Sequence, residues 1–129
     1  MTWDSIIDNF MVSKGFKEST IIGLDGSTWG YTPGCFLTAE EIKNILDLFE
    51  TKPKENQNIK LAGEQFQIYQ ARPREIYAKN GIDNVIIEKN KKSYVVGIYQ
   101  EDKILLGNAL INLQMMSDYI ERSYKKIKK

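Results

Sequence analysis

Two tryptophans, Trp3 and Trp29, are the residues whose types and positions best suit a recognition site. Trp29 lies in a predicted strand, where side chains alternate between faces, so Trp29 and Tyr31 are expected on one side. With Trp3 nearby, these rings would form an aromatic shelf. Such a shelf suits an extended proline-rich peptide, because a polyproline II helix is already ordered and its free carbonyls accept hydrogen bonds from indole N–H groups. For each tryptophan alone, packing in the core is the ordinary alternative.

Catalytic groups of the familiar kinds cannot be assembled from this chain. The sequence has no histidine and one cysteine, Cys35, which excludes Ser-His-Asp and Cys-His arrangements and Cys/His zinc sites. Residues 23–27 (GLDGS) lack the Lys-Ser/Thr ending of a phosphate-binding loop, and Asp25-Gly26 is typical of a hairpin turn. We therefore expect none of these sites, no cofactor and no metal, and we interpret Cys35 as incidental.

Composition places the chain among ordinary soluble globular proteins. It has 129 residues, 42% of them hydrophobic and 27% charged, and no apolar run that could span a bilayer. The start lacks the basic flank and apolar run of a signal peptide, and a single cysteine forms no intramolecular disulfide, which favours a reducing, cytosolic location. With a net charge of +1, the chain is not expected to bind nucleic acid.

Positive charge is concentrated at the C-terminal end. Residues 121–129 contain five cations and one carboxylate, a net charge of +4 that leaves −3 for the rest of the chain. A basic tail on a slightly acidic body suggests an anionic surface as an occasional partner. A solvated, frayed terminus explains the same pattern equally well.

Apolar spacing predicts three helices. The first covers residues 2–12 with Thr2 as its N-cap. The second follows Thr38, which forms a capping box with Glu41. The last begins near Leu106. The apolar faces of the second and last helices consist of Ile42, Ile45, Leu46 and Phe49, and of Ala109, Leu113, Met116 and Ile120.

Short β-type segments fill the rest of the chain. Residues 19–24 and 28–32 flank Asp25-Gly26 and predict a hairpin. Five further strands are expected at residues 59–61, 65–70, 75–78, 84–89 and 93–99. Short links between them imply antiparallel pairing, so we expect one α+β domain with a sheet covered by helices. If the first and last helices share a face, Trp3 lies near Tyr119 and Tyr124.

Several segments, in order and spacing, resemble the profilin family. They are Thr2-Trp3-Asp4 with Asp8, residues 21–29 (IIGLDGSTW), Pro33-Gly34, residues 59–66 (IKLAGEQF), 74–77 (REIY), 96–99 (VGIY) and 117–120 (SDYI). The resemblance runs in register over essentially the whole chain. It implies a profilin-like fold for residues 1–129, with a short basic tail at 125–129. In that fold the N- and C-terminal helices pack on one face of a central antiparallel sheet and a further helix packs on the other.

The resemblance also implies a function. Profilins bind monomeric actin and promote nucleotide exchange on it, bind poly-proline stretches in proline-rich proteins such as formins, and bind phosphoinositides. A member of the family is expected to be a cytoplasmic monomer at the cytoskeleton and cell cortex that regulates actin polymerisation and is no enzyme.

The poly-proline site is carried over residue by residue. Trp3 and Trp29 match the two family tryptophans, and Tyr119 and Tyr124 match positions on and after the last helix. Ile6 stands where tyrosine is usual, which removes one ring and one hydroxyl. The implied site consists of Trp3, Ile6, Trp29, Tyr31, Tyr119 and Tyr124. Residues 125–129 extend past the usual chain end and are expected to crowd the shelf or to favour acidic flanks on the peptide.

The actin site implied by the resemblance uses the later strands and the start of the last helix. Its residues are Arg74, Lys79, Lys89, Asn108, Ile111 and Gln114. Ile111 stands where a basic residue is common and Gln114 where an acidic one is common. Because an exposed ion pair contributes about 0–1 kcal/mol, we expect weakened rather than abolished binding. The alternative is that these lysines are solvated surface.

For phosphoinositides, a basic cluster is expected at neighbouring strand ends with the tail nearby. Its residues are Arg72, Arg74, Lys79, Lys125 and Lys126, and a phosphate-rich headgroup would suit them.

Two other interpretations stay open. One is a profilin-fold paralogue with weak or lost actin binding that acts as a peptide or lipid adaptor, as the departures at Ile111 and Gln114 suggest. The other is a structural interaction module with a similar sheet and no aromatic shelf.

Overall fold

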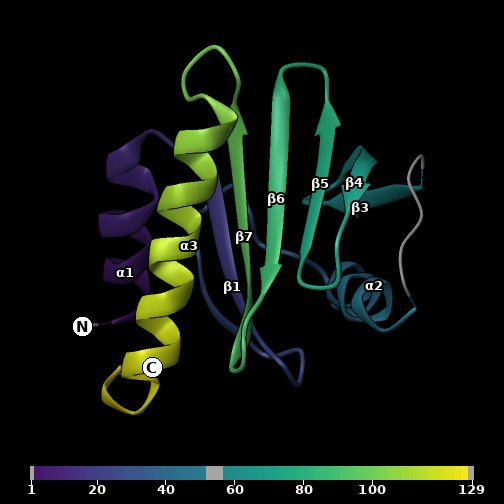
Figure 1. The fold of residues 1–129 in the computed structure, drawn as a ribbon. Coiled ribbons are helices and arrows are strands. Elements are labelled where there is room, and N and C mark those ends of the chain that lie inside the picture. Colours follow the sequence, from purple (N-terminus) through teal and green to yellow (C-terminus); the bar gives the residue numbers. More distant parts are fainter. Residues whose placement is uncertain (1, 52–56, 128–129) are drawn as a thin grey trace.

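Seven antiparallel strands form one curled sheet in the computed structural model, which describes residues 2–51 and 57–127 (Figure 1). The strand order across the sheet is β2-β1-β7-β6-β5-β4-β3. The strands are β1 (Glu18–Gly23), β2 (Thr28–Tyr31), β3 (Asn58–Leu61), β4 (Glu64–Ala71), β5 (Glu75–Asn80), β6 (Asp83–Lys89) and β7 (Ser93–Gln100). The predicted strands are confirmed, with ends that differ by one or two residues.

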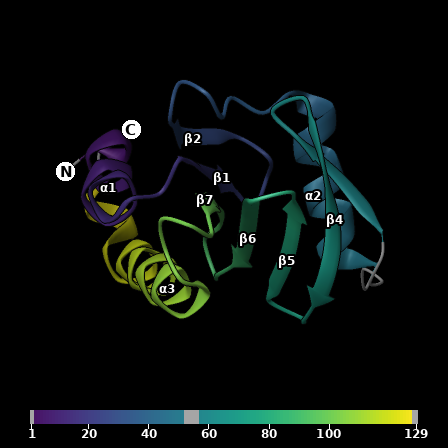
Figure 2. The same cartoon turned by 90° about the horizontal axis from the view of Figure 1, so that it is seen from above.

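Helices cover both faces of the sheet, as Figure 2 shows from above. Helices α1 (Trp3–Phe10) and α3 (Leu106–Ser123) pack on one face and α2 (Ala39–Glu50) packs on the other. Each face has its own apolar core, because successive strand residues alternate between the faces. Ile86 and Val95 belong to the core under α1 and α3, whereas Val85 and Val96 belong to the core under α2. The profilin-like architecture expected from the sequence is confirmed.

Both predicted N-caps are confirmed. Thr2 forms a capping box with Ser5 at the start of α1, and Thr38 forms one with Glu41 at the start of α2. Helix α1 ends at Phe10, two residues earlier than expected, because the chain tightens into the 3-10 turn η1 (Val12–Lys14). Gly15 then reverses the chain with a φ of +98°, a conformation that favours glycine.

The two chain ends meet at one side of the molecule (Figure 1). After α3, a second 3-10 turn, η2 (Tyr124–Lys126), brings the chain back toward the start of α1. The centroids of the Trp3 and Tyr124 rings are 6.4 Å apart, which confirms the expected approach of the termini. The predicted tail at 125–129 lies partly outside the described residues, which end at Ile127. No helix in the described part of the chain has both the length and the apolar character needed to span a membrane.

Candidate functional site

Three rings from three elements form an aromatic cluster where the termini meet. The cluster consists of Trp3 in α1, Trp29 in β2 and Tyr124 in η2. The Trp3 and Trp29 centroids are 4.6 Å apart, and those of Trp29 and Tyr124 are 5.1 Å apart. These separations lie within the range of favourable aromatic contact. The sequence prediction that Trp3, Trp29 and Tyr124 lie together is confirmed.

Two glycines make room for the tryptophans. A Cβ on Gly30 would lie 2.9 Å from Trp3 Cβ and 3.2 Å from Ile7 Cδ1, and a Cβ on Gly23 would lie 2.8 Å from the Trp29 ring. Real side chains do not approach so closely, so the cluster requires glycine at both positions. Sequence reasoning missed this role, since the chain carries no local sign of what packs against these strand residues.

The two indole N–H groups differ in their surroundings. Trp29 is half-buried, and its Nε1 donates a hydrogen bond to Ser27 Oγ at 3.0 Å. Trp3 is 2% exposed, and its Nε1 finds no acceptor among residues 2–51 and 57–127. A buried N–H without an acceptor is costly, so Trp3 carries an unused donor beneath the surface of the cluster.

Tyr31 does not join the aromatic cluster, which corrects the sequence prediction. A β-bulge between β1 and β2 places Ile21 opposite Gly30 but Ile22 opposite Thr28, so Trp29 is the extra residue. The bulge breaks the alternation and puts Trp29 on the same side as Gly30, toward α1. Tyr31 points to the other face of the sheet and packs edge-on against Phe36 at 4.9 Å.

Ile6 and Tyr119, the remaining residues predicted for the poly-proline site, do not belong to the aromatic cluster. Ile6 is fully buried in the core under α1 and α3, so the structure does not place it on an accessible surface. The half-buried Tyr119 packs on Phe10 at 5.4 Å, between α1 and α3. Tyr119 therefore packs between the two terminal helices, against Phe10 rather than against a tryptophan of the cluster.

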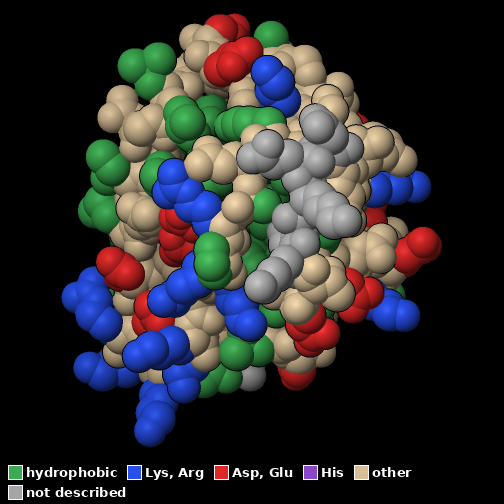
Figure 3. All heavy atoms as spheres, turned by 45° about the vertical axis from the view of Figure 1, so that its right-hand side comes forward, with side chains coloured by type: hydrophobic (Ala, Val, Ile, Leu, Met, Phe, Trp, Pro, Cys, Tyr) green, Lys and Arg blue, Asp and Glu red, His purple; other side chains and the backbone are tan. Residues whose placement is uncertain are grey.

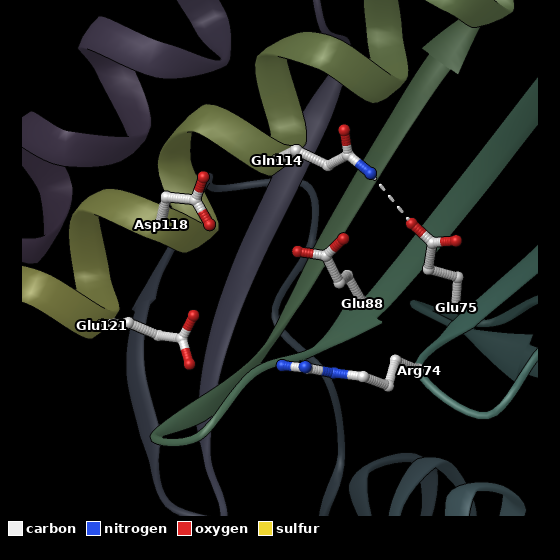
Figure 4. A pocket seen from close by; sticks show the side chains of 6 residues that line it. All are labelled: Arg74, Glu75, Glu88, Gln114, Asp118 and Glu121. Carbon is white, nitrogen blue, oxygen red and sulfur yellow. Dashed lines mark hydrogen bonds between the residues drawn. The ribbon is translucent and has the colours of Figure 1, made fainter.

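A second feature is an acidic pocket of about 420 Å³ between α3 and the strands β5 and β6 (Figure 4). Four carboxylates and one cation line it together with Gln114. They are Glu75, Glu88, Asp118, Glu121 and Arg74. Gln114 Nε2 donates to Glu75 Oε2 at 3.1 Å, and the Glu121 carboxylate accepts from the backbone N–H of Lys91 at 2.9 Å. Within the described residues, no group of three or more Asp, Glu, His or Cys side chains is arranged to hold a metal ion.

Glu88 is the most perturbed carboxyl of this pocket. Burial is the main cause that raises its pKa from the ordinary 4.5 to about 7. A hydrogen bond with Ser117 lowers the pKa and so opposes this shift. Contact with Glu75 and repulsion by Asp118 raise it further. Near neutral pH, Glu88 is therefore protonated in part of the molecules.

Residues predicted for actin binding fall into separate regions. Arg74 and Gln114 line the acidic pocket. Asn108 and Ile111 lie at the start of α3, beside Lys14 and Lys103. Lys89 points to the α2 face of the sheet, where its Nζ lies 5.7 Å from the Tyr94 ring centroid. It does not share a surface with Gln114, because its neighbour Glu88 occupies the α3 face.

The predicted basic cluster of Arg72, Arg74 and Lys79 is wrong as a single patch. Arg74 immediately precedes β5 and Lys79 is near its far end, about 16 Å away along an extended strand. Lys79 instead lies over the Tyr69 ring, 5.9 Å from its centroid.

A different basic edge appears at the end of the sheet near the chain termini. It consists of Arg72, Arg74, Lys91, Lys92, Lys125 and Lys126, all exposed. The Arg74 guanidinium donates to the Lys89 carbonyl at 3.2 Å, and Lys92 Nζ lies 5.3 Å from the Tyr124 ring centroid, so three chain segments meet there. Figure 3 shows Lys and Arg side chains gathered at the lower left of that view. Lys91 and Lys92 were not predicted for this surface, because these residues of the β6–β7 turn come to lie beside η2 only in the folded chain.

The surroundings of Cys35 do not suit a nucleophile. It is fully buried, and burial raises the pKa of its thiol to about 11. The thiolate needed for attack is therefore scarce near neutral pH.

Comparisons with family models and with curated proteins indicate the same family. The Profilin family model matches residues 1–124. Profilin-1A of Acanthamoeba castellanii is 33% identical over 122 residues, which cover 93% of this chain and 96% of that protein. Profilin-1 of Dictyostelium discoideum is 27% identical over 123 residues, with the same coverage.

Solved structures show the same fold. The structure of A. castellanii profilin IA superposes with a TM-score of 0.84 at 30% identity and covers 95% of this chain and 99% of that one. LokiProfilin1, solved in complex with rabbit actin, superposes with a TM-score of 0.75 at 15% identity and covers 92% of this chain and 93% of that one. At that identity the likeness concerns the fold alone.

Proposed function

Since this chain belongs to the profilin family, we propose that it binds monomeric actin, regulates actin polymerisation and binds proline-rich peptides on a separate surface. The observation that carries the proposal is the family match, which runs through both terminal helices and every strand. LokiProfilin1, which shares the fold, has been solved in complex with rabbit actin. We propose a monomeric, non-enzymatic protein of the cytoplasm that acts at the cytoskeleton and cell cortex.

For the actin-binding surface, we favour the acidic pocket and the exposed side of α3 next to it. Arg74, Gln114 and Asp118 surround a space that a partner side chain can enter (Figure 4). The excess of carboxylates suits a basic side chain of the partner more than an acidic one. Of the six residues that the resemblance implied for actin binding, Arg74 and Gln114 line this pocket.

Inhibition of spontaneous actin polymerisation tests this proposal. The wild-type chain in excess over pyrene-labelled monomeric actin is expected to slow polymerisation. Asp118→Lys, an exposed charge reversal on α3, is expected to weaken binding about tenfold, because it removes a carboxylate from the pocket. Asp47→Lys is the matched control, since Asp47 is exposed on α2 on the other face. Unchanged polymerisation with the wild-type chain in excess would argue against actin as partner.

For the proline-rich ligand, the aromatic cluster supplies the chemistry. Flat rings of Trp29 and Tyr124 offer stacking surface, and the indole N–H of Trp3 has no acceptor within the described part of the chain. Poly-proline presents carbonyl groups without internal hydrogen bonds, so the two are complementary. Trp29→Leu is expected to weaken binding of a poly-proline peptide, measured by calorimetry. Tyr31→Leu, on the other face of the sheet, is the control and should leave the affinity unchanged.

A second candidate function, binding to phosphoinositide membranes, is favoured by the basic edge. Its six cations come from the β4–β5 turn, the β6–β7 turn and η2, and we propose them in place of a set that includes Lys79. Sedimentation with phosphoinositide vesicles tests this. Lys91→Glu with Lys92→Glu is expected to reduce binding several-fold, because each basic residue near an anionic surface contributes about 1 kcal/mol. Lys43→Glu with Lys60→Glu, both exposed and outside the basic edge, is the control.

A further inference from the structure

The chain continues beyond the point where the family match ends, and the continuation folds back onto the core. The match ends at residue 124, and the structure describes three further residues. Lys125 and Lys126 are exposed, whereas Ile127 is 8% exposed and belongs to the same apolar core as Trp3 and Ile120. A buried apolar residue between lysines shows that this segment has a packed position rather than a solvated one.

The same segment holds Tyr124 against the tryptophans. The Tyr124 ring contacts both Trp29 and Trp3, and Lys92 Nζ lies 5.3 Å from its centroid. The 3-10 turn is closed by a hydrogen bond from the Ile127 N–H to the Tyr124 carbonyl at 3.3 Å. The buried side chain of Ile127 therefore anchors the turn that carries Tyr124.

Trp3 lies beneath the Tyr124 ring, in the same apolar core as Ile127. Its side chain is only 2% exposed, and its indole N–H is buried without an acceptor in the described part of the chain. A peptide carbonyl that reached this N–H would satisfy it, whereas no acceptor among residues 2–51 and 57–127 does so. A site whose hydrogen-bond donor is covered cannot use that donor until the cover moves.

We propose that residues 125–127 form an intramolecular cover that holds Tyr124 closed over Trp3, and that a proline-rich peptide must displace this cover to reach Trp3. The inference rests on the proposed peptide binding and concerns its regulation. A short segment held by one buried side chain opens locally at low free-energy cost, so the cover exchanges between closed and open positions. The apparent affinity for the peptide is reduced by the fraction of molecules that are open. Anything that binds the exposed Lys125 and Lys126 can shift this fraction.

Calorimetric titration with a poly-proline peptide tests the cover. Three chains are compared: the full chain, a chain that ends at Tyr124, and Ile127→Asp in the full chain, which removes the anchor and keeps the tail. Both altered chains are expected to bind the peptide about fivefold more tightly or better. Lys125→Ala with Lys126→Ala is the control, since it changes the charge of the segment and keeps Ile127, and its affinity should stay within about twofold of the full chain.

Acrylamide quenching of tryptophan fluorescence without peptide gives an independent reading. Greater quenching in the truncated chain and in Ile127→Asp, with tighter peptide binding, supports the cover. Equal or weaker peptide binding by both altered chains overturns it and leaves the proposed peptide site standing. If no chain binds the peptide, the proposed peptide function fails. In that case, raised quenching in both altered chains still supports the cover, and unchanged quenching refutes it.

Discussion

Glu88 shows how one side chain is governed by neighbours distant in sequence. It lies on β6 among Glu75 from β5 and Asp118 and Glu121 from α3, with Arg74 as the cation of the pocket. Burial and the neighbouring carboxylates raise its pKa to about 7. The folded chain therefore holds a proton on Glu88 that the unfolded chain releases above its ordinary pKa of 4.5. It follows that folding stability falls as pH rises from about 4.5 through about 7.

Glu88→Gln is expected to change the pH dependence of stability. The amide does not ionise, so the variant should gain stability relative to wild type as pH rises, by about 1 kcal/mol at pH 8 after allowance for solvent screening. Urea unfolding at pH 5 and pH 8 measures this. A stability difference between variant and wild type that is the same at both pH values would contradict the argument.

Gly30→Ala is expected to disturb the aromatic cluster. The added methyl would lie 2.9 Å from Trp3 Cβ, so α1 must shift, and the free energy of unfolding should fall by about 1–3 kcal/mol. The control is Gly107→Ala in α3, where no atom lies within 4 Å of the new Cβ. There the free energy of unfolding should rise by up to about 1 kcal/mol, because alanine favours the helix. Equal effects at the two positions would refute the packing role of Gly30.

At the scale of the secondary-structure elements, Glu41 joins the start of α2 to a turn outside the helix. Glu41 is 4% exposed, and its carboxylate accepts from the Thr38 N–H at 2.9 Å and from the Gly63 N–H at 3.0 Å. Gly63 lies in the turn between β3 and β4, where Ala62 and Gly63 both have positive φ angles of 52° and 85°. The capping box therefore also fastens this turn to α2.

Glu41→Ala is expected to lower the free energy of unfolding by about 2–3 kcal/mol, because two backbone N–H groups lose a charged acceptor. Glu40→Ala is the matched control. Glu40 is exposed in the same turn of helix, and its loss should cost about 0.5 kcal/mol through the helix dipole. Thermal unfolding of both variants decides the matter, and similar losses would show that the contact to Gly63 contributes nothing.

For the whole molecule, the aromatic cluster and the acidic pocket lie in different places. The cluster joins α1, β2 and η2, whereas the pocket lies between α3 and the strands β5 and β6. Their ligands need not compete. The basic edge lies next to the cluster through Lys92 and Tyr124 and shares Arg74 with the pocket, so a lipid headgroup there would affect the ligands of both surfaces.

We expect actin and a poly-proline peptide to bind at the same time. Asp118→Lys should weaken actin binding and leave peptide affinity unchanged, and Trp29→Leu should do the reverse, because distant sites behave additively. Calorimetry with each ligand alone, and with the other at saturation, measures the coupling. A peptide affinity that falls more than about threefold in the presence of actin would contradict independent surfaces.

Local patterns in the sequence sufficed for most of the fold. Capping boxes at Thr2 and Thr38, the Asp25-Gly26 turn and the strand spacing depend on neighbouring residues, and the strands fall within one or two residues of their predicted bounds. The resemblance also put Trp3, Trp29 and Tyr124 together, as the structure has them.

Only the tertiary structure decided where the functional surfaces lie. The bulge at Trp29 depends on the register of β1 against β2, and it moved Tyr31 to the other face. The acidic pocket needs α3 to cross β5 and β6, and the basic edge needs three turns to meet. The burial of Ile127 depends on the path of the chain after α3. Apart from the bulge within the β1–β2 hairpin, each is a contact between segments far apart in the chain, and no local pattern of residues specifies such a contact.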